Sequence, residues 1–192
     1  MKALVACEYS GRVRDALIRN GVDAISCDLL PTDVEGPHYQ GDVFDIITDG
    51  FDLMVCHPPC THLAVSGSRH FAAKIADGRQ QRALDFVQRL MDAPIEHIAL
   101  ENPVSVISSK IRKPDQYVEP WMFGHGETKK TGLWLKNLPL LTPTNIVEGR
   151  EQRIHKIPPS KDRWKIRSTT YQGIADAMGH QYSEYIRNHY SK

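Results

Sequence analysis

This sequence of 192 residues has few cysteines, no long apolar run and almost no net charge. The four cysteines all lie in the first third of the chain, and three of them sit in or beside apolar runs. No stretch approaches the roughly 18 consecutive apolar residues of a membrane helix. Glu8 interrupts the short apolar start of the chain, so we expect neither a membrane span nor a secretory signal. The sequence therefore predicts a cytoplasmic globular protein with reduced thiols.

Glycine is also sparse where a dinucleotide-binding loop would need it. After the first apolar run, only Ser10-Gly11 is present, and Arg12 and Val13 stand where further glycines would be expected. A pyrophosphate cradle depends on a glycine-rich turn that lets the backbone approach the phosphates. The thin glycine content therefore favours a nucleoside cofactor without phosphates over a dinucleotide.

Short apolar runs alternate with helical patterns along the chain. The patterns predict strands at residues 2–7, 23–27, 52–56 and 95–100, and later strands at 132–135 and 154–157. They predict helices at 12–19, 78–92 and 170–189, a short helix at 44–47, and a loop at 61–77. This alternation implies right-handed crossovers and a mostly parallel sheet flanked by helices. We therefore expect an α/β fold in which residues 1–192 form a single catalytic domain.

Polar residues follow the predicted strands, where ligands bind in open parallel sheets. The candidates after predicted strands are Glu8, Ser10, Gly11, Asp28, Pro58, Cys60 and Glu101, and Asp42 precedes the strand at 52–56. Asp28 is placed to accept hydrogen bonds from ribose hydroxyls, although a turn or helix cap would also explain it. Ser10 is equally a candidate cap for the helix at 12–19.

Cys60 is the most informative of these residues. It follows Pro58-Pro59 in a polar loop, where a cysteine does not serve core packing. A thiolate near cations or helix N-termini is a nucleophile. Cys56 and Cys60 lack a second pair of ligands, so we expect no metal site. Glu101 follows the apolar end of a neighbouring strand, where a carboxyl group with a raised pKa can act as an acid.

The combination resembles the DNA (cytosine-5)-methyltransferase family, in a small form similar to phage and prophage proteins. The resemblance rests on Pro59-Cys60 after the fourth strand and on Glu101-Asn102 after the fifth. It implies a Rossmann-like methyltransferase fold and S-adenosyl-L-methionine as cofactor. It also implies that Glu8, Ser10, Gly11, Asp28, Asp42 and Pro58 bind this cofactor, with Asp28 on the ribose and Asp42 on the adenine.

The resemblance implies a mechanism as well. The Cys60 thiolate adds to carbon 6 of cytosine, protonated Glu101 bonds to N3, and carbon 5 takes the methyl group. Gln152-Arg153 resembles the arginine-containing eighth motif of the family, which would bring Arg153 to the base carbonyl. Uracil carries a proton on N3, which an amide oxygen can accept more readily than a carboxylic acid can. Asn102 therefore leaves uracil as an alternative substrate.

The sequence departs from the family in one large feature. Only about 15 residues separate Arg153 from the lead-in to the final helix, where the family inserts a target-recognition region. The substrate is therefore duplex DNA, single-stranded DNA or a nucleotide, and a protein partner could supply recognition. Three alternatives stay open: a pyrimidine-nucleotide modifying enzyme, a non-catalytic decoy that binds S-adenosylmethionine or nucleic acid, and a structural domain without a ligand.

Positive charge gathers late in the chain. Residues 1–60 carry a net charge of −6 and the remaining residues +7, although the whole chain carries only +1. The 149–168 segment is rich in lysine and arginine, and its predicted nucleic-acid contacts are Arg150, Lys161, Arg163, Lys165 and Arg167. Such cations bind phosphates without reading sequence, although a solvated loop would look the same.

Overall fold

A computed structural model describes residues 1–190 of the chain, and its centre is a sheet of seven strands. The strand order is β3-β2-β1-β4-β5-β7-β6. The strands are β1 (Lys2–Ala6), β2 (Asp23–Asp28), β3 (His38–Gln40), β4 (Leu53–Cys56), β5 (His97–Pro103), β6 (Gln116–Val118) and β7 (Thr131–Lys136). The first five strands pair in parallel and β7 runs antiparallel to both β5 and β6. The prediction of a mostly parallel α/β sheet is confirmed.

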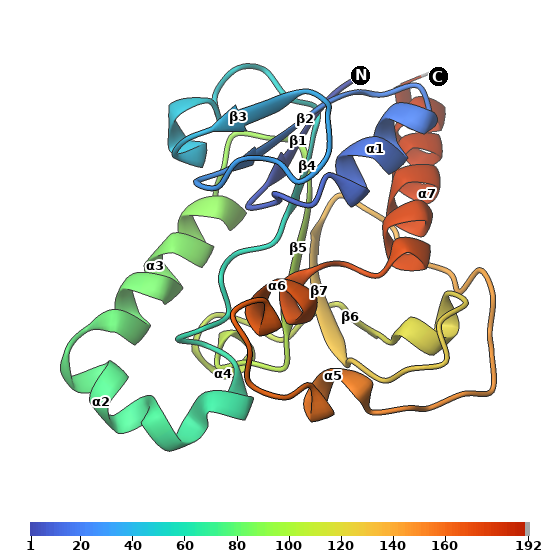
Figure 1. The fold of residues 1–192 in the computed structure, drawn as a ribbon. Coiled ribbons are helices and arrows are strands. Elements are labelled where there is room, and N and C mark those ends of the chain that lie inside the picture. The colour runs from blue at the N-terminus through green and yellow to red at the C-terminus, as the bar shows by residue number, and fades with distance from the viewer. Residues whose placement is uncertain (191–192) are drawn as a thin grey trace.

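Helices cover both faces of this sheet. The α-helices are α1 (Arg12–Arg19), α2 (Phe71–Ala76), α3 (Arg79–Met91), α4 (Ile107–Lys110), α5 (Arg153–Lys156), α6 (Arg163–Ser168) and α7 (Gln172–Tyr190). The 3₁₀ helices are η1 (Val43–Asp45), η2 (Val65–His70) and η3 (Pro120–Met122). Helices α1 and α7 pack on one face and α3 on the other, while α2, α4, α5 and α6 gather beyond the carboxyl ends of the central strands (Figure 1).

Alternation along the central strands builds two cores. Ala3 and Val5 of β1 face the core under α1 and α7, whereas Leu4 and Ala6 face the core under α3. This division follows from the two-residue period of a strand. In α7, a Cβ on Gly179 would lie 2.7 Å from the carbonyl carbon of Ala16. Glycine is therefore needed where α7 crosses α1.

Three sequence predictions need correction. The strand predicted at 154–157 is helix α5, because Ile154 and Ile157, three residues apart, lie on one side of a helical turn. The loop predicted at 61–77 contains η2 and α2, since residues 71–76 are rich in helix-forming alanine. The strand predicted to stop at residue 100 continues to Pro103, because β7 pairs with this extension.

The start of α1 also differs from the prediction. Ser10 was the expected cap, but its hydroxyl is a long 3.4 Å from the amide of Arg12. The buried carboxylate of Glu8 accepts hydrogen bonds from the amides of Val13 at 2.8 Å and Arg14 at 3.2 Å. Glu8 therefore caps the helix from outside it. Gly11 adopts a φ of 73°, a conformation that favours glycine.

Candidate active site

The Pro-Pro-Cys loop leaves the end of β4 and is fixed at several points. The amide of His57 donates to the carbonyl of Ala6 at 3.0 Å. Asn102, at the end of β5, donates from Nδ2 to the carbonyl of Pro58 at 2.9 Å and is 1% exposed. The carbonyl of Cys60 closes the next turn by accepting from the amide of Ala64 at 2.9 Å. The loop therefore holds Cys60 at the carboxyl edge of the sheet, as the sequence predicts.

The Cys60 thiol is half-buried among opposing charges. Burial raises its pKa above the usual value, and the carboxylate of Glu101 raises it further. Lys129 and Arg167 act in the opposite direction and favour the thiolate. The Glu101 carboxylate and the two cations therefore act in opposite directions on the thiol.

Glu101 lies beside His57 at the back of the loop. The Nδ1 atom of His57 is 3.9 Å from Oε1 of Glu101, and both side chains are about nine-tenths buried. The Nε2 atom of His57 is buried and has no hydrogen-bond partner among the described residues. His57 lines the cavity that holds Cys60, whereas Glu101 is not among its lining residues in the described chain. Asn102 points to the loop backbone, which gives no support to its suggested contact with a uracil.

Two cavities meet at this loop. The larger has a volume of about 710 Å³ and contains Cys60 on its wall. The smaller has a volume of about 550 Å³ and lies against α3. Both are lined by Cys7, Asp28 and Pro59. A ligand in the smaller cavity therefore reaches the edge of the larger one, which is the arrangement that group transfer between two bound molecules requires.

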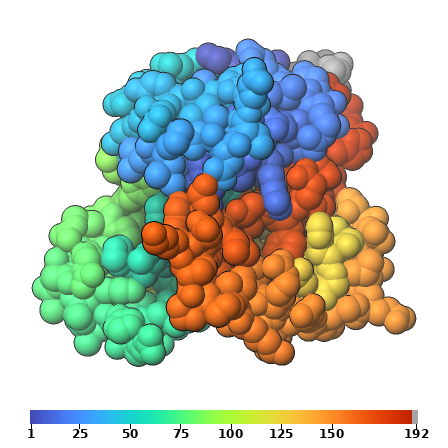
Figure 2. Space-filling view, viewed as in Figure 1, coloured from blue at the N-terminus to red at the C-terminus, as the bar shows by residue number. Residues whose placement is uncertain are grey.

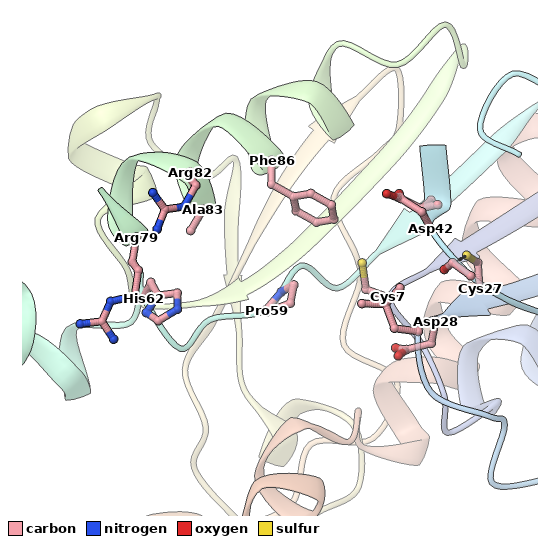
Figure 3. Close-up of a pocket in the computed structure, with 13 residues that line it drawn as sticks. Cys7, Cys27, Asp28, Asp42, Pro59, His62, Arg79, Arg82, Ala83 and Phe86 are labelled. Atoms are coloured by element: carbon pink, nitrogen blue, oxygen red, sulfur yellow. Dashed lines mark hydrogen bonds between the residues drawn. The ribbon is translucent and has the colours of Figure 1, made fainter. Parts of the chain in front are cut away.

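Acidic and apolar side chains line one end of the smaller cavity (Figure 3). Asp28 accepts a hydrogen bond from the amide of Leu30 at 2.9 Å, and burial raises its pKa. Asp42 uses one carboxylate oxygen to cap η1, at 3.0 Å from the amide of Phe44. Phe86 and Pro59 lie between this end and a basic end formed by Arg79, Arg82 and His62.

The other predicted cofactor residues lie outside the two cavities. In the described chain, Glu8, Ser10, Gly11 and Pro58 line neither of them. Glu8 uses both carboxylate oxygens on the amides at the start of α1, where a Rossmann-type fold commonly binds a phosphate. A ligand phosphate at this helix terminus would meet that carboxylate.

Arg153, predicted to contact the base, is directed elsewhere. Its Nε donates to Glu127 at 3.0 Å, and the hydroxyl of Tyr171 donates to the same carboxylate at 2.5 Å. These two hydrogen bonds outweigh burial and hold the pKa of Glu127 below its usual value. Arg153 does not line the Cys60 cavity in residues 1–190, although the adjoining Ile154 and His155 do.

The basic segment is more structured than a solvated loop. In Figure 2 its orange surface lies below the blue first third of the chain and beside the green arm around α2. Arg150 stacks over Trp121 at 3.8 Å, and Lys165 pairs with Asp33 at 2.7 Å. Arg167 lines the Cys60 cavity instead of the outer surface.

The remaining two predicted cations of this segment differ from each other. Lys161 is exposed, as a backbone contact requires. Arg163 is half-buried, and its Nε atom is buried without a hydrogen-bond partner among residues 1–190. The segment therefore offers separate cations rather than one continuous basic strip.

Sequence reasoning missed several residues of the site. The Cys60 cavity is also lined by Lys129 and Lys130, just before β7, and by Tyr9 and Trp164, from opposite ends of the chain. The smaller cavity is also lined by Phe86 of α3. Phe86 falls in the helix predicted at 78–92, where nothing in the sequence marks it as a site residue. No local motif marks the others, because distant segments bring them together.

Neither a metal cluster nor a membrane helix is found in residues 1–190. No three His, Cys, Asp or Glu side chains there are grouped to hold a metal ion. None of the helices described is long and apolar enough to span a bilayer.

Comparison with known proteins identifies the fold. No protein-family model and no curated protein sequence matches the chain. A solved structure described as a DNA modification methyltransferase encoded within a prophage (E. coli) matches with a TM-score of 0.54 and 17% identity. The Entamoeba histolytica methyltransferase EhMeth matches with a TM-score of 0.51 and 15% identity. These matches cover 77% and 79% of this chain, and the chain spans about half the length of each neighbour, 52% and 57%. The chain therefore has a fold similar to that of methyltransferases.

Proposed function

We propose that this protein is an S-adenosylmethionine-dependent methyltransferase that modifies carbon 5 of cytosine in DNA, with Cys60 as its nucleophile. The observation that carries the proposal is the junction of two cavities at the Pro59-Cys60 loop, with Glu101 influencing the thiol. One cavity has the lining of a nucleoside site and the other presents a cysteine. The likeness to methyltransferase structures supports the same class of reaction.

The smaller cavity fits the proposed cofactor chemically. Asp28 would accept hydrogen bonds from the ribose hydroxyls, and the free oxygen of Asp42 would accept one from the adenine amine. Phe86 and Pro59 provide apolar walls for the ring. The Glu8 carboxylate at the start of α1 suits a cofactor without phosphates. The cofactor supplies an electrophilic methyl group, and its sulfonium charge suits an acidic cavity end.

The charge on Glu101 matters for the nucleophile. Burial and a negative Glu101 both raise the pKa of the Cys60 thiol, so neutralising this carboxylate would remove the repulsion and favour the thiolate. In this proposal the neutral Glu101 is also the acid that donates to N3 of cytosine. Lys129 and Arg167 stabilise the thiolate from the other side.

The reaction then proceeds at the base. The sulfur of Cys60 forms a bond to carbon 6, and electron density moves to carbon 5. Carbon 5 would then bond to the methyl carbon as the methyl–sulfur bond of the cofactor breaks, and S-adenosylhomocysteine would leave. Loss of the proton from carbon 5 to a base expels the thiolate and restores the ring. Arg167 and Lys129, which line the Cys60 cavity while Arg153 is engaged with Glu127, are the cations that support the base carbonyl in this proposal.

A nucleotide-modifying enzyme is the second candidate function. The cations that line the Cys60 cavity would suit the phosphate of a free pyrimidine nucleotide as well as that of a strand. Cytosine is favoured over uracil in both cases, because Asn102 is held on the backbone of the loop. The two functions differ in substrate size, which an activity assay separates.

The proposal is tested by transfer of labelled methyl groups from S-adenosylmethionine to duplex DNA, single-stranded DNA, RNA and dCMP. We expect incorporation into carbon 5 of cytosine in DNA, and its loss in Cys60→Ser. Cys56→Ala, which removes a buried thiol that lines neither cavity, serves as a matched control and should retain transfer. Incorporation into dCMP alone would favour the second candidate, and undiminished transfer by Cys60→Ser would refute the cysteine mechanism.

A further inference from the structure

Trp164 is an exposed aromatic side chain at the mouth of the Cys60 cavity. It belongs to α6, lines the cavity, and is 51% exposed. The other two tryptophans are covered: Trp134 is 1% exposed, and the guanidinium of Arg150 lies over Trp121. A half-exposed indole beside a functional cavity is the kind of apolar surface that marks a binding site.

The ring of Trp164 is held in place rather than left free. Its centroid lies 5.6 Å from that of Tyr9, with the planes inclined at 58°. The hydroxyl of Tyr9 shares a 2.8 Å hydrogen bond with Ser168, and Lys165 pairs with Asp33. Helix α6 is therefore fixed to the loops that follow β1 and β2. A platform ordered in advance loses less entropy when a ligand stacks on it.

The charges around this ring suit a polyanion. Lys129, Lys130 and Arg167 line the cavity, and Asp28, at the junction with the smaller cavity, is its one carboxylate in residues 1–190. No ion pair engages the guanidinium of Arg167 within that part of the chain. Aromatic rings combined with cations are how proteins bind single-stranded nucleic acid, since every base has a face for stacking.

We infer that Trp164 is a stacking platform for the nucleotide next to the target cytosine, and that the substrate is single-stranded DNA. The inference rests on the proposed function for the identity of the cavity as the site of the target base. With the target base beside Cys60, its neighbour on the strand lies at the cavity mouth. The phosphate between them then meets the lysines and Arg167 that line the walls.

The inference predicts how affinity depends on strand length. A free dCMP lacks the second base and gains nothing from Trp164, whereas a hexanucleotide stacks on it. One base–aromatic stack corresponds to a loss of about 5-fold to about 150-fold in affinity when the ring is removed. Up to three phosphate contacts would give a log–log salt dependence with a slope of about −2 on a single strand.

The test is equilibrium binding, without cofactor, of fluorescent d(TTCTTT), a matching duplex and competing dCMP. Wild type should prefer the single strand, and Trp164→Leu should lose at least about 5-fold in affinity for it while its affinity for dCMP stays unchanged. Ile166→Ala is the matched control, because Ile166 is 43% exposed on the same helix and does not line the cavity.

Three outcomes would overturn the inference. They are equal or tighter binding of the duplex, no binding of the hexanucleotide by wild type, and an unchanged hexanucleotide affinity in Trp164→Leu. Quenching of the wild-type tryptophan emission by the hexanucleotide, but not by dCMP, provides a measurement that needs no variant. Length-dependent binding with no methyl transfer would refute the proposed function while leaving this binding mode standing.

Discussion

The hydrogen bond between Asn102 and Pro58 gives the sharpest mutational prediction outside the reacting groups. Asn102→Ala removes the donor and leaves the buried carbonyl of Pro58 unpaired. The loss of one partner from a buried hydrogen bond costs about 1–3 kcal/mol. For a chain of this size, about 1 kcal/mol lowers Tm by roughly 2–4 °C, so Tm should fall by about 2–12 °C. Differential scanning calorimetry measures this shift.

The same substitution should change the reactivity of Cys60. The Asn102 bond ties the Pro-Pro-Cys loop to β5, so its loss lets the loop open locally and exposes the half-buried thiol. Alkylation of Cys60 by iodoacetamide, followed by mass spectrometry, should therefore be faster in Asn102→Ala. Asn188→Ala, an exposed change on α7, should leave both Tm and alkylation unchanged. An unaltered Tm together with an unaltered alkylation rate would refute the anchoring role of Asn102.

Three further predictions concern the carboxylates and one helix crossing. Glu101→Gln removes the negative charge that raises the pKa of the Cys60 thiol. When the rate of Cys60 alkylation is measured against pH, its midpoint should therefore move to lower pH. An unmoved or higher midpoint would contradict the effect of Glu101 on the thiol. Asp28→Asn should weaken S-adenosylmethionine binding at least about tenfold, or about 1.4 kcal/mol, in isothermal titration calorimetry, and an unchanged affinity with an intact fold would retire its role at the ribose. Gly179→Ala places a Cβ 2.7 Å from the carbonyl carbon of Ala16. Overpacking should lower the free energy of unfolding, measured by urea titration, by about 1–3 kcal/mol. An unchanged free energy of unfolding would show that α1 and α7 can move apart without cost.

The central strands and long helices were predictable because their signals are local. The apolar run at the start of β1, the run into β4 and the amphipathic pattern of α3 each identify their own element. Strands β3 and β6 have three residues each and exist because a longer strand pairs with them. Their pairing partners lie elsewhere in the chain, so no local pattern announces them.

The residues of the site also differ in whether a local signal in the sequence could predict them. Cys60, Asp28 and Asp42 were predictable as cavity residues because each lies beside a recognisable strand on one edge of the sheet. Glu101 was expected just after a strand, but it lies within β5 and lines neither cavity in residues 1–190. The direction of Arg153 was not, because it depends on Glu127 and Tyr171, which lie 26 and 18 positions away in the sequence. A motif can fix the position of a residue on an element without fixing the partner of its side chain.

The central claim is that Cys60 bonds covalently to cytosine, and trapping that bond tests it most directly. In an oligonucleotide with 5-fluorocytosine, fluorine replaces the proton that must leave carbon 5, so the enzyme stays attached after methyl transfer. Wild-type protein with S-adenosylmethionine should give an adduct that survives denaturing electrophoresis, and mass spectrometry of its peptides should locate the bond at Cys60. Cys56→Ala, whose thiol lines neither cavity, should form the same adduct and Cys60→Ser none. An adduct formed by Cys60→Ser, or none formed by a wild type that methylates unmodified cytosine, would contradict the account.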